Sequence, residues 1–251
     1  MERSEFYLTL PSNASMNVFP DNTLSDFSVR PPQPIELTGE WEVCLKEIQY
    51  PRTWNNVRKT ENHFYVRDAK GIPRVFILKE GYYSNANDII QGIDDAIDDR
   101  QTKDSIDIQF DKISRRFTIN VLNGYSIAFS ASIAIILGFG HSFSTINKKT
   151  VAPFVINLEG GLSSIYVYSD VIQAQIVGDS MVPLLRILSV EGKDGDIISK
   201  TFQDPPFYPV SRKTIDQIQV NIKDDTGRKV PFESGRVIVQ LHFKQRRPLY
   251  L

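Results

Sequence analysis

The sequence has one cysteine, three histidines and almost no net charge. Its 29 Lys and Arg residues nearly balance 30 Asp and Glu residues, which gives a formal charge of −1. A single cysteine, Cys44, excludes an internal disulfide, and it favours folding in a reducing compartment. Near-neutral charge excludes a strongly basic nucleic-acid binder and an acidic disordered chain. These absences remove classes of protein but leave the function open.

Long apolar runs are also missing. The longest strongly apolar stretch, at about 127–139, is interrupted by Ser130, Ser132 and Gly138. It is shorter than the ~20 apolar residues that cross a bilayer, so we expect no membrane span. The residues after Met1 are polar rather than apolar, so we expect no secretory signal.

Alternation of apolar and polar residues, by contrast, recurs from end to end. Aromatic residues, which favour strands, make up 11% of the chain. An alternation with period two is typical of a strand with one buried face. It occurs at residues 6–10, 41–45, 106–110, 117–121, 218–222 and 237–243. The chain is therefore expected to be mainly β, in a sandwich or a barrel.

The strand that begins at Trp41 changes phase in its middle. Apolar residues alternate as far as Leu45 and resume at Ile48. One extra residue in the strand would turn the later apolar side chains back to the buried face, so we predict a β-bulge near Lys46-Glu47. The same alternation places Cys44 on the polar face of this strand.

Turn signals agree with a β-rich chain. Leu122-Asn123-Gly124-Tyr125 lies between two alternating runs, and Asn-Gly tolerates the positive φ angles of a type I′ turn. This is the strongest hairpin signal in the sequence. Two further Gly-containing turns, at 225–227 and 233–235, are expected in the link between the last two strands.

One stretch is typical of a longer helix. Ile89, Ile93 and Ile97 fall on one helical face, which predicts a helix over about 86–99. A second, shorter helix is expected at 133–137, ended by Gly138. The residues that can cap the start of the first helix are Ser84, Asn85 and Asn87.

The helical signals are confined to one part of the chain. Residues of about 60–142 alternate strands and helices, whereas the flanks, about 1–58 and 150–251, are almost purely β. This contrast predicts a small α+β subdomain inserted into a β-sandwich.

Candidate catalytic groups are few. His63, His141 and His242 are widely separated and have no ligand-spaced partner, so no metal site is predicted. Asp225, in Asp-Thr-Gly, is the one candidate catalytic centre, since aspartic proteases carry this tripeptide. Those enzymes place it after a hydrophobic strand, but here charged residues flank it. A charged hairpin turn is the better interpretation.

Four other features have an ordinary structural explanation. The segment 191–196 lacks the spacing of a phosphate loop or an EF-hand. The aspartates at 94, 95, 98 and 99 form a solvated helix face. Cys44 has no His nearby in sequence. The basic run 244–247 could contact nucleic acid or an acidic partner, but four residues supply little affinity and a solubilising tail explains it equally well. We therefore predict no catalytic, cofactor-binding or metal-binding residues and no specific nucleic-acid site.

Several segments together resemble the minor capsid, or penton, protein of Polinton/Maverick elements and the related adintoviruses. They cover most of the chain in order, and the specificity lies in the set rather than in one motif. They are 10–15 (LPSNAS), 19–22 (FPDN), 27–30 (FSVR), 39–43 (GEWEV), 47–54 (EIQYPRTW), 81–85 (GYYSN), 137–139 (LGF), 165–170 (IYVYSD), 177–186 (VGDSMVPLLR), 224–228 (DDTGR) and 231–237 (PFESGRV).

The resemblance implies a single jelly-roll protein that is not an enzyme and has no cofactor. Five copies would form a homopentamer at each icosahedral vertex, among trimers of a double jelly-roll major capsid protein. The protein would then be made in the host cell, assembled in the nucleus or cytoplasm, and located in the virion. A ring of this kind needs heterologous contacts between different faces of neighbouring protomers.

Two other functions stay open at this point. The aromatic-rich β composition and the expected insertion are compatible with a receptor- or glycan-binding β-sandwich protein of a virus. An enzyme centred on Asp225 is the third possibility. A major capsid protein would need two jelly rolls, for which 251 residues are very short.

Overall fold

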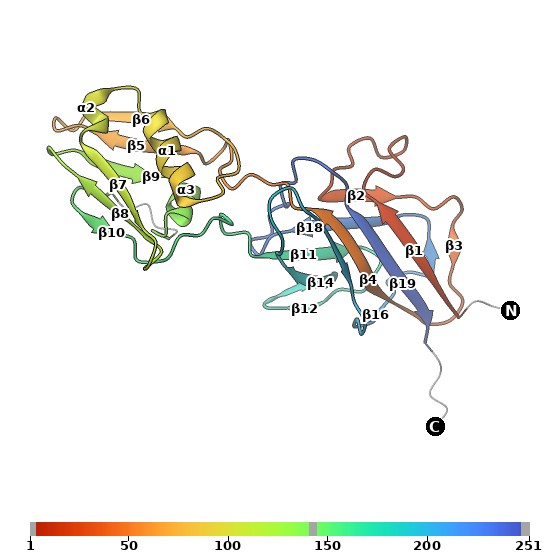
Figure 1. Ribbon diagram of the computed structural model, residues 1–251. Helices are drawn as coiled ribbons and strands as arrows, with labels where there is room; N and C mark the ends of the chain where they lie inside the picture. Colours follow the sequence, from red (N-terminus) through yellow and green to blue (C-terminus); the bar gives the residue numbers. More distant parts are fainter. Residues whose placement is uncertain (1–3, 141–144, 247–251) are drawn as a thin grey trace. The chain divides into compact units, whose positions relative to one another are not determined.

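The computed structural model describes residues 4–140 and 145–246, and Figure 1 shows that strands dominate it. The chain divides into two compact units. The first is built from both ends of the chain, Met1–Trp54 and Leu162–Leu251, and the second is Asn55–Gly161.

The first unit contains two antiparallel sheets. The first sheet has the spatial order β1 (Glu5–Pro11), β19 (Ile238–Gln245), β4 (Trp41–Pro51) and β15 (Ile197–Thr201), with β16 (Tyr208–Pro209) also paired to β4. The second sheet has the order β14 (Leu184–Ser189), β11 (Ser164–Ser169), β18 (Ile218–Lys223) and β2 (Asp26–Val29). Two small ladders accompany them: β3 (Ile35–Glu36) with β17 (Thr214–Ile215), and β12 (Gln175–Val177) with β13 (Ser180–Val182).

The strand order is that of a jelly roll. If the eight strands of the two sheets, without β16, are numbered along the chain, the sheets run 1-8-3-6 and 5-4-7-2. Every connection except that between the fourth and fifth strands crosses from one sheet to the other. A two-sheet antiparallel sandwich of eight strands wound in this way is a jelly roll, so the predicted fold class is confirmed.

One apolar core fills the space between these sheets. The alternation predicted for β18 is confirmed, because Ile218, Val220 and Ile222 are fully buried. Side chains from both sheets contribute, among them Phe27 of β2 and Phe243 of β19. Burial of this alternating set stabilises the sandwich.

The bulge predicted in β4 is confirmed. Gln240 of β19 lies opposite Glu47, but the next residue, Leu241, lies opposite Leu45, so Lys46 is the extra residue. The extra residue returns Ile48 to the core face on which Leu45 lies.

Cys44 lies on the outer face of β4, as the alternation predicts, but a distant segment covers that face. Cys44 does point away from the sandwich core, yet it is fully buried. The chain after β15 covers this outer face, since the Phe202 carbonyl accepts a 2.9 Å hydrogen bond from Lys46 Nζ, and the Phe207 ring packs against His242 opposite Cys44. Alternation within one strand cannot reveal a cover from a distant segment.

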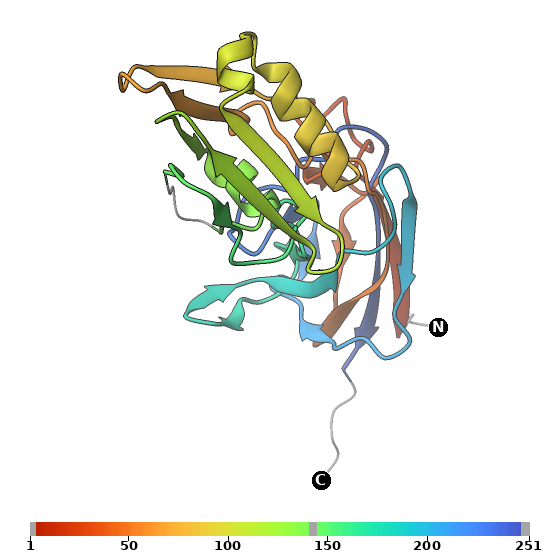
Figure 2. The same cartoon turned by 60° about the vertical axis from the view of Figure 1, so that its left-hand side comes forward.

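The described part of the second unit has two three-stranded sheets and three helices, and Figure 2 shows them from a second side. One sheet has the order β6 (Pro73–Ile77), β5 (His63–Arg67) and β9 (Ser126–Phe129), and the other β10 (Thr150–Val151), β8 (Arg116–Val121) and β7 (Ile106–Asp111). The helices are α1 (Ala86–Ala96), α2 (Arg100–Lys103) and α3 (Ala131–Ile136). A separate apolar core holds them together.

The helix signals in the sequence are confirmed in part, because α1 ends at Ala96 rather than near residue 99, and Asp99 caps α2 instead. Asn85 caps α1, because its side chain accepts hydrogen bonds from the backbone N–H groups of Asn87 and Asp88. Ile89 and Ile93 are buried as the periodicity predicts. Gly138 follows α3 with a φ of +79°, the left-handed conformation that ends a helix.

The Asn-Gly turn forms, but it does not make a hairpin. Asn123 and Gly124 both have positive φ, and the Tyr125 N–H donates to the Leu122 carbonyl at 3.0 Å. The flanking strands nevertheless pair elsewhere, β8 with β7 and β10, and β9 with β5. The turn therefore passes the chain from one sheet to the other, and the predicted hairpin was wrong.

No helix within residues 4–140 and 145–246 has both the length and the apolar character needed to cross a bilayer.

Candidate assembly surfaces

The two described histidines belong to different units. His63 lies in the second unit, His242 lies in the first, and His141 falls outside the described residues. No group of three His, Cys, Asp or Glu side chains that could hold a metal ion occurs within residues 4–140 and 145–246.

Asp225, the candidate catalytic residue, lies exposed in a turn. The adjacent Asp224 is the buried one, with 5% exposure. Its carboxylate accepts hydrogen bonds from Thr226 Oγ1 at 2.6 Å and from the backbone N–H of Arg228 at 2.9 Å. Asp224 therefore shapes this charged turn, which agrees with the structural interpretation of the Asp-Thr-Gly tripeptide.

His242 belongs to an aromatic cluster on the outer face of the first sheet. Its ring stacks on Tyr7 with 4.3 Å between centroids, and its Nε2 lies 3.1 Å from the Glu5 carboxylate. Phe207 packs edge-on against the same ring, and Lys244 Nζ lies 3.7 Å from the Phe207 centroid. Cys44 lies opposite His242 in the β4–β19 pair and is buried, and burial raises the pKa of its thiol to about 11. A thiol of that pKa is a poor nucleophile at neutral pH.

The remaining charged features are paired in ordinary ways. In the second unit, Arg74 bonds Asp98 and Asp99, and Lys103 lies 3.2 Å from Asp94. Solvent screens surface pairs of this kind, so they contribute little to stability.

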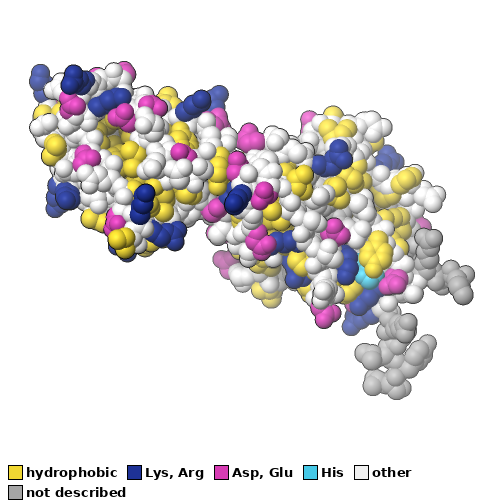
Figure 3. All heavy atoms as spheres, viewed as in Figure 1, with side chains coloured by type: hydrophobic (Ala, Val, Ile, Leu, Met, Phe, Trp, Pro, Cys, Tyr) yellow, Lys and Arg dark blue, Asp and Glu magenta, His cyan; other side chains and the backbone are white. Residues whose placement is uncertain are grey.

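The basic run and the Gly-rich segment lie in the first unit. Lys244 of the basic run pairs with Glu42 at 3.0 Å, and Arg247 falls outside the described residues. In the segment 191–196, Asp196 accepts from the Lys193 N–H at 2.7 Å, and Glu191 pairs with Lys200. Figure 3 shows cationic and anionic side chains intermixed on the face of each unit in view, without a field of one sign.

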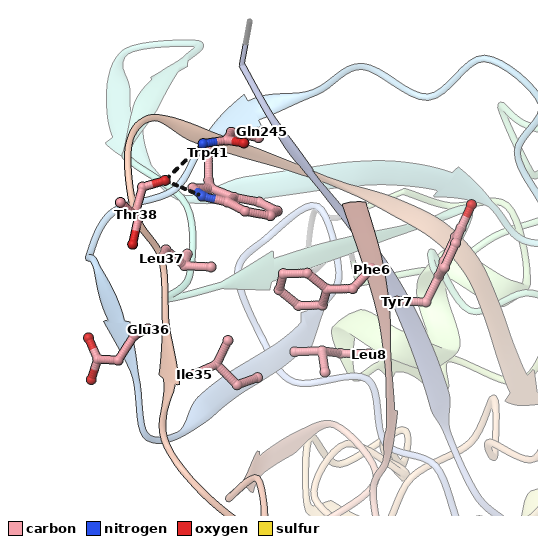
Figure 4. Close-up of a pocket in the computed structure, with 9 residues that line it drawn as sticks. All are labelled: Phe6, Tyr7, Leu8, Ile35, Glu36, Leu37, Thr38, Trp41 and Gln245. Carbon is pink, nitrogen blue, oxygen red and sulfur yellow. Dashed lines mark hydrogen bonds between the residues drawn. The ribbon is translucent and has the colours of Figure 1, made fainter. Parts of the chain in front are cut away.

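A groove runs beside β1, at the edge of the first sheet. It encloses about 470 Å³. Figure 4 shows apolar side chains from β1 and from the chain around β3 facing one another across it. At one end, the Thr38 carbonyl accepts hydrogen bonds from Trp41 Nε1 and Gln245 Nε2, both at 3.0 Å. The apolar lining consists of Phe6, Leu8, Ile35, Leu37 and Trp41.

The backbone of β1 is open toward this side. Within the described residues, β1 ends the first sheet and pairs with β19 alone. Gln245 N–H donates to the Ser4 carbonyl, and Ser12 N–H donates to the Val237 carbonyl. Because bonded and non-bonded pairs alternate in an antiparallel ladder, the even-numbered residues of β1 are the ones that bond β19. Tyr7 and Thr9 therefore direct their N–H and C=O groups to the free edge, where no strand of the described chain pairs with them.

The β12–β13 hairpin is a second place where apolar side chains are exposed. In Figure 2 it is the teal hairpin that extends away from the two sheets of the first unit. Ile176 and Met181 lie opposite each other across it. They are 78% and 64% exposed. The opposite face is partly covered, and it includes Gln175, whose side chain bonds the Leu184 carbonyl.

The second unit also has exposed apolar residues on its edge strand β6. Val75 and Ile77 point to the same face, opposite Tyr65 and His63 of β5. Neither this face nor the groove produced a signal in the sequence, because each depends on which strands end a sheet. A local signal for the hairpin went unused: Gly178-Asp179, with a positive φ at Gly178, is the two-residue turn between the paired residues Val177 and Ser180.

Comparisons with known proteins bear on the fold. No protein-family model matches the chain, and no curated protein matches it in sequence. Among solved structures, the mavirus penton protein is similar with a TM-score of 0.53 and 11% identity, over 96% of this chain and 100% of that one. A chain of the Sputnik virophage is similar with a TM-score of 0.50 and 9% identity, over 97% and 98%. The chain thus shares, across both of its units, the fold of a penton protein from a virus.

Proposed function

We propose that this chain is a penton, a minor capsid protein that forms homopentamers at the icosahedral vertices of a Polinton/Maverick-type DNA virus. One observation carries the proposal: the match to the mavirus penton protein covers 96% of this chain and the whole of that one, jelly roll and second unit together. The role is structural rather than enzymatic, and no residue of the chain is assigned to catalysis.

The second unit is proposed to be a subdomain inserted between β4 and β11. Its buried residues form their own cluster, separate from that of the sandwich. The chain enters and leaves this unit side by side, because Asn56 Nδ2 donates to the Leu158 carbonyl at 2.8 Å. An insertion whose two ends meet can be accommodated in one loop of a jelly roll.

The proposed partners are four further copies of this chain and a double jelly-roll major capsid protein. The virion is the proposed location, with assembly in the nucleus or cytoplasm of the host cell. A formal charge of −1 supports this role, because a wall component need not neutralise the genome.

Native mass spectrometry and electron microscopy of the purified chain test the proposal. We expect a species of five protomers and rings with five-fold symmetry. A strictly monomeric protein at the highest soluble concentration, which also fails to associate with a co-expressed major capsid protein, would contradict it.

A further inference from the structure

The two sheets of the first unit have edges on two opposite flanks. β1 and β2 end the sheets on one flank, and β14 and β15 end them on the other. Lys200 Nζ of β15 donates to the Ser189 carbonyl of β14 at 3.1 Å, which joins the edges of the second flank. Figure 1 shows β1 with β3 at one side of this unit and β12 with β14 at the other.

The groove and the hairpin lie on different flanks. The groove follows the free edge of β1, whereas β13 leads through Pro183 directly into the edge strand β14. A ring with five-fold symmetry needs two different surfaces, one on each side of the protomer. An apolar projection on one flank and an apolar recess on the other meet that requirement.

The two features also match in their backbone groups. Tyr7 and Thr9 present N–H and C=O groups on the free edge of β1. β12 and β13 pair only with each other among the described residues, so the hairpin has open outer edges as well. An extended segment that adds to an open sheet edge gains main-chain hydrogen bonds, while alternate side chains fill the adjoining recess.

We infer that the β12–β13 hairpin of one copy docks on the β1 flank of the next copy in the ring. The hairpin strand that runs parallel to β1 pairs with its free edge. In that arrangement a residue that bonds Tyr7 and Thr9 lies opposite Leu8 and on the same face, so Ile176 and Met181 cover the groove lined by Phe6, Leu8 and Trp41. The occupant of the groove is therefore a second copy of this chain. The inference rests on the proposed pentamer and names the contact that closes it.

Two aspartate substitutions on the hairpin test the apolar part of the contact. In the variant Ile176→Asp/Met181→Asp, each carboxylate would have to be desolvated on docking. We expect the protomer concentration at half-assembly, measured by native mass spectrometry, to rise at least about tenfold. The matched control is Ile113→Asp, because Ile113 is 94% exposed in the β7–β8 turn of the second unit and should leave assembly unchanged.

A substitution on the other side tests the strand pairing. Thr9→Pro removes an N–H group that makes no bond to β19, and proline is tolerated on an edge strand. We expect the melting temperature of the protomer to change little while assembly is weakened at least about tenfold. Unchanged assembly by this variant would exclude pairing through the free edge of β1.

Cross-linking then identifies the two surfaces directly. The native Cys44 is buried, so a Met181→Cys variant and a Glu36→Cys variant each present one accessible thiol. We expect a disulfide-linked dimer when the two variants are mixed and none with either variant alone. Linkage within either variant alone would indicate a symmetric contact and overturn the inference.

The outcomes separate this contact from the proposed function. A wild-type protein that never assembles contradicts both. A pentamer that survives Ile176→Asp/Met181→Asp overturns the contact and leaves the penton proposal standing.

Discussion

At the scale of single residues, the turn after β18 depends on Asp224 rather than on Asp225. Asp224 is buried and accepts hydrogen bonds from Thr226 and Arg228, whereas Asp225 is exposed. Hydrogen bonds to a charged group contribute about 1.5–3 kcal/mol each. We expect Asp224→Asn to lower the free energy of unfolding by about 1–3 kcal/mol in urea titrations. The control, Asp225→Asn, should change it by less than about 0.5 kcal/mol.

The effect of Asp224 should depend on pH. Burial raises the pKa of its carboxyl group. Hydrogen bonds from Thr226 and Arg228 and the charge of Arg228 lower the pKa by more than burial raises it, so the pKa lies below its ordinary value. A carboxyl group whose pKa is lower in the folded state stabilises the protein at any pH above its unfolded-state pKa, which is about 4. This stabilisation is lost as the pH falls through the folded-state pKa. The difference between wild type and Asp224→Asn should thus shrink below about pH 4. A constant difference down to pH 2 would contradict this account.

Cys44 allows a test of the cover over the first sheet. Its thiol is fully buried and its pKa is raised to about 11. We expect no alkylation by iodoacetamide at pH 8 in the folded protein, and complete alkylation in guanidinium chloride. Phe207→Ala should open the cover and make Cys44 reactive in the folded state, because Phe207 packs on His242 opposite Cys44. Rapid labelling of the folded wild type would show that the cover opens readily.

What alternation did not predict for Cys44 is its burial. The strand pattern gives the face on which Cys44 lies, but contacts across the fold, such as the packing of Phe207 against His242, decide whether that face is exposed. The Asp-Thr-Gly tripeptide forms the charged turn that its flanking residues favoured. Burial by distant segments leaves no periodic signal in the strand itself.

At the scale of elements, the junction after α3 requires glycine for two reasons. Gly138 has a φ of +79°, and a Cβ there would lie 2.3 Å from the Phe154 carbonyl oxygen. Gly71 has the same φ, but open space surrounds its Cβ position. We expect Gly71→Ala to cost about 1 kcal/mol through backbone strain alone. Gly138→Ala should cost at least about 2 kcal/mol more, because backbone atoms must shift. Equal melting temperatures for the two variants would show that the α3 junction relaxes freely.

A helix or a bulge was predictable where the residue pattern of a single segment determines it. The phase slip after Leu45 located the bulge at Lys46, and the isoleucine spacing located α1. Pairing was not predictable in the same way. The Asn123-Gly124 turn has the expected φ angles but joins strands of different sheets. The strand before it, β8, forms its hairpin with β7 instead, through residues 112–115, where Asp111 accepts hydrogen bonds from Ile113 and Ser114.

At the scale of the whole molecule, composition and alternation led to a mainly β chain, and the resemblance narrowed it to a jelly roll. The strand order 1-8-3-6 and 5-4-7-2 depends on pairs far apart in the sequence, such as β1 with β19. The groove beside β1 has the same origin, since residues of the chain around β3 form its far wall. A surface formed by segments that are far apart in the sequence cannot be predicted from the sequence of one segment alone.

The division into two units leads to a deletion experiment. No buried residue of one core belongs to the other, and Asn56 lies beside Leu158 where the chain enters and leaves the second unit. We expect the first unit to fold when residues 55–161 are replaced by a short Gly-Ser linker, and residues 55–161 to fold as a separate fragment. Cooperative thermal unfolding and dispersed amide NMR spectra measure both outcomes.

A deletion within the sandwich is the matched control for that experiment. Removal of residues 164–189 takes out β11 and β14, half of the second sheet, and should prevent folding. Because the β12–β13 hairpin and the β1 groove both lie in the first unit, the variant without residues 55–161 should still assemble into five-fold rings. Rings formed by the whole chain but not by this folded variant would place an essential ring contact in the second unit.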